Sequence, residues 1–331
     1  MEKIDFVITW VDGKDPIWQI EKNKYMNKSI QEFNTNSRYR DWDNLQYWFR
    51  GVEKYAPWVN KIYFVTCGHI PQWLNTDNPK LQIVRHEEII PQEYLPTFTS
   101  TVIELYLYKI KNLSEKFVYF NDDMFIINKV QPRDFFYKEI PCDAAVINPI
   151  IPQGKDDVVD HITLNCMDAV NKNFDVKQIM KKNFFKYINI KNGNENIRNF
   201  CLLPWPKVPS FKIRHIPNSF VKATFEDVWK KEKNILLKTS ENKFRTKDDV
   251  SQYIFKFWQL GSAKFHPRKY NIGYYYEIDN NNIQLKNVIK TKKYKLLCIN
   301  DAKENIDFDK VKDEIKRIFD IKLQEKSSYE L

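Results

Sequence analysis

Glycine is scarce in this chain of 331 residues. There are seven glycines, about 2% of the chain where roughly 7% is usual. None of them falls in the G-x-G-x-x-G pattern of dinucleotide-binding folds or in the G-x-x-x-x-G-K-S/T pattern of a P-loop. Both nucleotide-binding fingerprints are therefore excluded.

Cysteines and long apolar runs are also scarce. The five cysteines are scattered, odd in number and never spaced as C-x-x-C, which predicts reduced thiols and neither a disulfide framework nor a zinc site. No apolar run approaches the ~18–20 residues of a membrane span. Glu2 and Asp5 stand where a signal peptide would have basic and then apolar residues. We therefore expect a cytoplasmic protein.

Aromatic residues and positive charge are abundant instead. An aromatic content of 15% excludes a disordered chain, because such side chains need a core to bury them. Lysine and arginine exceed aspartate and glutamate by 53 − 43 = 10. This excess suggests an anionic partner, such as phosphate, nucleic acid, an acidic polymer or an anionic membrane face. A generally lysine-rich composition would explain it equally well.

The first third of the chain alternates between strand and helix patterns. Apolar, β-branched runs predict strands at residues 6–11, 62–66, 81–84 and 117–120. Helical spacing predicts helices at 43–55 and 101–110. Strands separated by helices indicate an α/β fold with a mainly parallel sheet covered on both faces. Ligands of such sheets bind at the carboxyl ends of the strands.

The middle of the chain has a different character. Lysine-rich, helix-like stretches lie at residues 176–187, 219–237 and 248–260, around a proline-rich break at 203–209. Strand patterns return at 274–278 and 295–299, and an amphipathic helix with Asp307 as its N-cap ends the chain. We expect a single catalytic domain, 1–331. Its α/β core comprises 1–153 and 262–331, and 154–261 form a helical insertion that acts as a lid or acceptor side.

Acidic residues follow three of the predicted strands. Asn121-Asp122-Asp123 is the sharpest case, Asp12 and Asp15 follow the first strand, and Asn300-Asp301 follow the last. Adjacent carboxylates repel one another, and a divalent cation with a preference for oxygen ligands, Mg²⁺ or Mn²⁺, removes that cost. An isolated cluster of this kind is more often an exposed turn, but three clusters at three strand ends favour a site.

Basic side chains offer further candidates. His215 lies where an apolar stretch meets Pro217, which would hold it rigidly as a general base requires, and His86 follows a predicted strand. Either could equally be a structural histidine. Arg40 and Arg245 could grip phosphate oxygens in a bidentate manner or form surface ion pairs.

These segments together resemble the Stealth family, which includes bacterial capsular and exopolysaccharide phosphotransferases and the lysosomal-enzyme N-acetylglucosamine-1-phosphotransferase. Four blocks match. The first is Asp5 to Gly13, and the second runs from Arg40-Asp41-Trp42-Asp43 through Pro71-Gln72-Trp73-Leu74 to Asn121-Asp122-Asp123. The third is Arg214-His215-Ile216-Pro217 with Phe244 to Asp249, and the fourth is Cys298 to Asp301 with Ser327 to Glu330. The likeness spans the chain and is weakest in the insertion.

The resemblance implies a nucleotide-sugar-binding sheet of the GT-A type. It also implies transfer of a hexose- or N-acetylhexosamine-1-phosphate from a UDP-sugar to an acceptor hydroxyl, with release of UMP. The acceptor would be an oligosaccharide or polysaccharide, and a lipid-linked one would bring the enzyme to the cytoplasmic membrane face. The cofactor would be Mg²⁺ or Mn²⁺.

Roles for individual residues follow from the same resemblance. Metal ligands would be Asp122, Asp123 and Asp301; catalytic residues would be His215, Asp123, Arg245 and Asp249; donor contacts would be Trp10, Asp12, Gly13, Arg40 and Asn121. His215 would take the proton of the acceptor hydroxyl, and Asp249 would orient that histidine or bind metal.

Two rival functions need different chemistry. A metal-dependent glycosyltransferase would attack the anomeric carbon and release UDP. A non-catalytic module that binds nucleic acid or acidic glycan through its charge would bind more weakly as salt increases. That module would leave the acidic strand ends without a role, so we expect no nucleic-acid partner.

Overall fold

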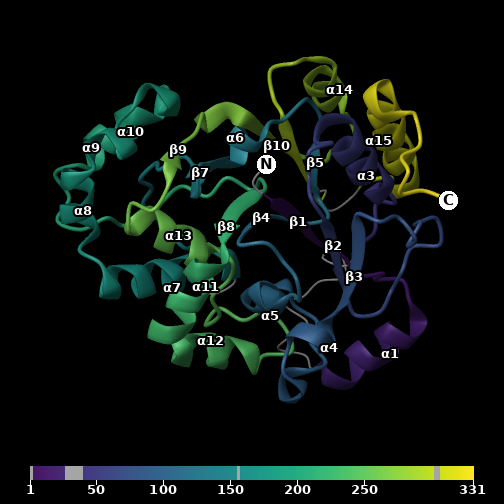
Figure 1. The fold of residues 1–331 in the computed structure, drawn as a ribbon, viewed down its shortest axis with the longest axis horizontal. Coiled ribbons are helices and arrows are strands. Elements are labelled where there is room, and N and C mark those ends of the chain that lie inside the picture. Colours follow the sequence, from purple (N-terminus) through teal and green to yellow (C-terminus); the bar gives the residue numbers. More distant parts are fainter. Residues whose placement is uncertain (1–2, 27–39, 155–156, 302–305) are drawn as a thin grey trace.

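The computed structural model describes residues 3–26, 40–154, 157–301 and 306–331 (Figure 1). Its central sheet has the strand order β3-β2-β1-β4-β8. The strands are β3 (Leu81–Arg85), β2 (Ile62–Thr66), β1 (Ile4–Thr9), β4 (Lys116–Phe120) and β8 (Asn218–Val221). The first four are parallel, and β8 runs antiparallel to β4 at the edge. The prediction of a mainly parallel α/β sheet is confirmed.

Helices cover both faces of this sheet, so every residue of β1, β2 and β4 is buried. Phe6 and Ile8 of β1 belong to one core cluster, together with α3 (Leu45–Tyr55) and α15 (Phe308–Leu323). Val7 belongs to a second cluster on the opposite face. Alternate side chains of one strand therefore hold two separate apolar layers.

The second cluster is built largely from helices of the middle of the chain. These helices are α7 (Val158–Asn173), α8 (Val176–Lys182), α11 (Lys222–Lys231), α12 (Lys233–Ser240) and α13 (Tyr253–Gly261). The short helices α9 (Phe184–Tyr187) and α10 (Glu195–Leu202) lie further out, at the left of Figure 1. Describing 154–261 as an insertion remains a prediction.

A second, smaller sheet brings the end of the chain beside β4. It has the order β10-β11-β5, from β10 (Gly273–Glu277), β11 (Leu296–Asn300) and β5 (Met124–Ile126). Strand β5 begins directly after Asp123, and its residue Met124 pairs with Cys298 of β11. The acidic segment after β4 is therefore held against the carboxyl end of β11.

Further helices are α1 (Pro16–Tyr25), α4 (His86–Ile89), α5 (Ser100–Tyr106), α6 (Pro132–Phe135) and α14 (Ile283–Lys290). A third sheet has the order β6-β7-β9, from β6 (Phe136–Tyr137), β7 (Ile140–Asp143) and β9 (His266–Pro267). Asp307 caps α15 as predicted by accepting the backbone N–H of Lys310. Within the described ranges, no helix combines the length and apolarity needed to cross a membrane.

The structure corrects the sequence prediction in the middle of the chain. Residues 219–237 do not form one helix, because Ser219 and Phe220 pair with β4 and Phe220 is completely buried. The 16-residue helix α7 does not appear among the predicted helical stretches, which followed lysine-rich patterns.

Candidate active site

A cleft of about 780 Å³ opens at the carboxyl ends of the strands. Thr9 lies at the end of β1, and Asn121 to Asp123 directly follow β4. Ile299 and Asn300 are the last residues of β11, and Asp301 follows that strand. His215 and Arg245 reach the same cleft from the middle of the chain. Segments from the beginning, middle and end of the chain therefore share one hollow.

The cleft is lined by the carboxylates of Asp41, Asp122 and Asp123. Asp122 is exposed to the open cleft, yet desolvation by the surrounding protein raises its pKa to about 7, and the charges of Asp123 and Asp41 add to that rise. The Oδ1 atom of Asp123 is buried and has no hydrogen-bond partner among the described residues. Repelling carboxylates with an unused oxygen fit a hard divalent cation, Mg²⁺ or Mn²⁺.

His215 is held between two partners. Its Nε2 atom lies 2.9 Å from Oδ2 of Asp123, and its Nδ1 atom lies 3.2 Å from the hydroxyl of Tyr253. Burial would lower the pKa of His215, but the charge and hydrogen bond of Asp123 raise it above its usual value. The neighbouring Arg214 donates to the carbonyls of Tyr270 and Gly273, which anchors the segment beside β10.

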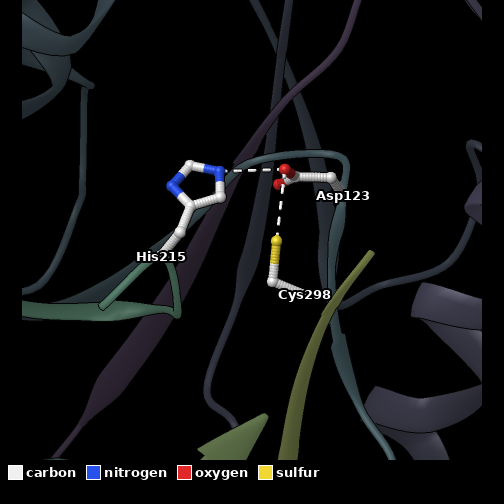
Figure 2. Close-up of side chains that lie close together, drawn as sticks. All are labelled: Asp123, His215 and Cys298. Carbon is white, nitrogen blue, oxygen red and sulfur yellow. Dashed lines mark hydrogen bonds and ion pairs between the residues drawn. The ribbon is translucent and has the colours of Figure 1, made fainter. Parts of the chain in front are cut away.

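Cys298 lies on the other side of the same carboxylate. Figure 2 shows His215 and Cys298 both directed at Asp123. The Sγ–H group donates to Oδ2 of Asp123 over 3.4 Å, and the three ligand atoms of this trio lie within 4.8 Å of one another. Burial, together with Asp123, raises the pKa of the Cys298 thiol well above its usual value.

Two arginines line the cleft at separate points. Arg245 donates from Nη2 to the Ser100 hydroxyl over 3.0 Å. Arg40 lies 3.6 Å from Asp301, whose Oδ1 atom also accepts the indole N–H of Trp42 over 3.1 Å. The cleft thus holds cationic groups as well as carboxylates, a combination suited to a ligand that carries phosphates.

Asp12, Gly13 and Asp249 are placed differently. None of the three is among the described residues that line the cleft, whereas Trp10 and Asn121 are. The carboxylate of Asp12 accepts the backbone N–H of Lys14. The carboxylate of Asp249 accepts from Asn242 and from the backbone and hydroxyl of Thr246, which closes the turn that precedes α13. The functional roles given to these three remain predictions.

Other residues of the cleft were not singled out from the sequence. Glu104 is 3% exposed, and its carboxylate accepts the backbone N–H of Gln252 over 2.9 Å. Burial raises the pKa of Glu104, and Arg245 opposes that rise. The sequence feature that could have identified Glu104 is its position between Ile103 and Leu105. A carboxylate in an apolar helical stretch is buried with the stretch and needs a compensating partner.

His86 also lines the cleft, at the carboxyl end of β3. Burial lowers its pKa to about 4, with a smaller contribution from His69. His86 is therefore neutral at physiological pH, and it offers the cleft an uncharged imidazole.

Two family models match this chain. The family model for Stealth protein conserved region 1 matches residues 2–30, and that for conserved region 2 matches residues 38–142. Among solved structures, galactosyltransferase LgtC in complex with donor and acceptor sugar analogs aligns over 98% of both chains, with a TM-score of 0.36 and 9% identity. That overlap is weak.

Curated relatives align over the full chain. The chain is 46% identical over 332 residues to capsular polysaccharide phosphotransferase WcwK of Streptococcus pneumoniae, covering 100% of this chain and 98% of the relative. It is 40% identical to an exopolysaccharide phosphotransferase of Lactiplantibacillus plantarum, covering 99% and 96%. A receptor polysaccharide phosphotransferase of Streptococcus oralis is 38% identical over the whole of both chains. Similarity of this extent shows that the protein is an enzyme of the phosphotransferase class and a member of the Stealth family.

Proposed function

We propose that this enzyme transfers a sugar-1-phosphate from a UDP-sugar to a hydroxyl group of a saccharide acceptor. The acceptor oxygen forms a bond to the phosphorus that carries the sugar. The bond from that phosphorus to the bridging oxygen of the diphosphate breaks, and UMP leaves with the bridging oxygen. The product is a phosphodiester in a surface polysaccharide.

The pairing of His215 with Asp123 inside the cleft is the observation that carries this proposal. Attack by a hydroxyl needs a group that removes its proton, and phosphoryl transfer otherwise depends on positioning and charge neutralisation. The cleft supplies both an imidazole with a carboxylate partner and the cationic side chains Arg40 and Arg245.

In this proposal the two nitrogens of His215 have different tasks. Asp123 accepts the N–H of Nε2, so the basic lone pair lies on Nδ1, where the Tyr253 hydroxyl now stands. An acceptor hydroxyl that replaces Tyr253 at Nδ1 would pass its proton to the ring. The Asp123 carboxylate would then stabilise the imidazolium ion that forms.

The two oxygens of Asp123 can serve two purposes. Oδ2 contacts His215, and Oδ1, which has no hydrogen-bond partner among the described residues, would face a cation. Asp122 and Asp301 line the same cleft, but within the described part of the chain their oxygens do not group with Asp123 within 4.8 Å, so they would have to move toward the cation to bind it. A bound Mg²⁺ or Mn²⁺ would neutralise charge on the donor diphosphate. Arg245 and Arg40 would hold the remaining phosphate oxygens.

The acceptor and location belong to the same proposal. A growing polysaccharide, or an oligosaccharide on a lipid carrier, would present its hydroxyl in the cytoplasm. The excess of ten positive charges would attract the enzyme to an anionic membrane face.

Identifying the released nucleotide tests the proposal. Purified enzyme is incubated with UDP-sugars, a saccharide acceptor and Mg²⁺ or Mn²⁺, and the products are separated by anion exchange. We expect UMP, together with a product whose phosphorus is in a phosphodiester. Release of UDP would mean attack at the anomeric carbon and would refute phosphoryl transfer.

A further inference from the structure

The thiol of Cys298 has no task in the proposed reaction, although it is directed into the centre of the site. Its sulfur, the Nε2 atom of His215 and a carboxylate oxygen of Asp123 lie within 4.8 Å of one another (Figure 2). Sulfur, imidazole nitrogen and carboxylate oxygen are the three ligand types that Zn²⁺ combines in proteins. The cysteine spacing in the sequence did not reveal this grouping, because the three residues are far apart in the chain.

The three ligand atoms, all within 4.8 Å of one another, lie close to the separations of a tetrahedral ion. Bonds of about 2.0–2.3 Å to Zn²⁺ place tetrahedral ligand atoms roughly 3.3–3.7 Å apart. Oδ2 of Asp123 lies 3.4 Å from Sγ of Cys298 and 2.9 Å from Nε2 of His215. Small side-chain movements would admit the ion, and its fourth position would face the cleft.

Rigid elements hold all three ligands. Asp123 and Cys298 lie on adjoining segments of the smaller sheet, where Met124 pairs with Cys298 and the N–H of Ile299 donates to the carbonyl of Asp123 over 2.9 Å. Arg214 anchors the segment of His215, and Tyr253 contacts its other ring nitrogen. A partner on that second nitrogen fixes the ring and strengthens a metal-ligating histidine.

The site is reachable although Cys298 is fully buried. The side chains of His215 and Asp123 are 28% and 23% exposed, and both line the cleft. An ion could therefore enter from the cleft and meet the sulfur last.

We propose that Asp123, His215 and Cys298 form a binding site for Zn²⁺ and similar thiol-preferring cations, which shares Asp123 with the oxygen ligands proposed for Mg²⁺ or Mn²⁺ and adds a nitrogen and a sulfur ligand. Binding forms a bond between Sγ and the ion and breaks the S–H bond, and the proton passes to solvent. Mg²⁺ does not compete well for such ligands, because it prefers oxygen.

Zn²⁺ in this site inhibits the enzyme, a consequence that rests on the proposed function. Metal bonding to Nε2 of His215 places the ring proton on Nδ1, the atom assigned above as the base. The ion also takes the Asp123 carboxylate away from the imidazole. The ring then has no lone pair for the acceptor proton, whatever the concentration of Mg²⁺.

Cobalt titration of the metal-free full-length protein tests the site without relying on turnover. Co²⁺ bound to a thiolate gives a near-ultraviolet charge-transfer band, and Zn²⁺ should abolish that band by displacement. We expect one equivalent to bind to the wild type and the band to be lost in Cys298→Ser, whose fold is checked by circular dichroism.

Cys67→Ser is the matched control, because Cys67 is exposed and its sulfur lies 3.5 Å from Nδ1 of His69, a second cysteine–histidine pair. This variant should keep the band. A band that persists in Cys298→Ser and disappears in Cys67→Ser would overturn the proposal, as would the absence of any thiolate band in the wild type.

Inhibition is measured separately, with Mg²⁺ in excess. Relative to the wild type, Cys298→Ser should require about tenfold or more Zn²⁺ for half-inhibition, the loss in metal affinity expected when such a site is damaged. Equal sensitivity of the wild type and both variants would refute zinc inhibition through this site. A cobalt band without any turnover would instead count against the proposed function alone.

Discussion

Replacement of His215 by alanine is the most informative perturbation of the proposed mechanism. Both ring nitrogens contact protein groups, Asp123 and Tyr253, so we expect the substitution to affect the acceptor proton more than the binding of the donor. A positioned general base contributes about 10²–10⁴-fold to rate, which corresponds to about 3–5 kcal/mol of transition-state stabilisation. We expect His215→Ala to lose kcat by this factor while its Kd for the UDP-sugar changes by less than about threefold, or about 0.7 kcal/mol.

The assay pairs single-turnover UMP release with calorimetric titration of the donor. Imidazole added to the buffer should partly restore the rate of His215→Ala, because the vacated space opens onto the cleft. His161→Ala is the matched control, since His161 contacts the carbonyl of Gly154 and is not among the described residues that line the cleft. It should retain wild-type kcat.

Two results would refute the reasoning. If His215→Ala binds the donor much more weakly but turns over bound donor at the normal rate, His215 is a binding residue. If kcat is unchanged, the base lies elsewhere in the cleft.

Three further substitutions test the carboxylate of Asp123, the contact between Glu330 and Arg50, and the packing of α3 against β5. Asp123→Asn should reduce kcat by about 10³-fold or more, because the neutral amide cannot stabilise the imidazolium ion or a bound cation; near-normal turnover in the UMP assay would contradict both roles. Glu330→Gln should lower the free energy of unfolding by about 1–3 kcal/mol at neutral pH. The carboxylate of Glu330 accepts hydrogen bonds from Nε and Nη2 of Arg50 over 2.8 and 2.7 Å, and the substitution weakens both. Burial alone would raise the pKa of Glu330, but its hydrogen bonds and the charge of Arg50 lower it below 4.5. The difference between wild type and variant in urea unfolding should therefore be full above that value and shrink as pH falls through the lowered pKa; a difference independent of pH would contradict this cause. Gly51→Ala should destabilise the protein by about 1–3 kcal/mol in the same assay, because a Cβ atom would lie 2.5 Å from the carbonyl oxygen of Ile126; unchanged stability would mean that β5 moves away freely.

Most strands of the main sheet could be predicted from local sequence because β1, β2 and β4 are rich in apolar residues and buried along their whole length. Residues 62–66 and 117–120 coincide with strands whose every residue is buried, and helical spacing placed α3 and α5 close to their observed positions. Strand β8 was missed because its short run becomes a strand only through pairing with β4. Its local pattern continues smoothly into a helix.

The candidate site was predictable in its acidic members and in His215, but their contacts were not. Asp122 and Asp123 follow an apolar strand, a pattern visible in sequence, and the structure places both in the cleft with Asp301. Asp12 follows a strand in the same way, yet its carboxylate accepts the backbone N–H of Lys14. The position of a residue at a strand end does not fix the direction of its side chain.

The sequence by itself determined the alternation of strands and helices, the Stealth blocks and the supply of carboxylates at strand ends, because these depend on neighbours within a few residues. Only the tertiary structure decided that Asp123 stands between His215 and Cys298. That arrangement follows from β5 pairing with β11 and from the anchoring of the His215 segment beside β10. Contacts between residues about 90 and 175 positions apart depend on how the sheets pack, and no local pattern encodes that packing.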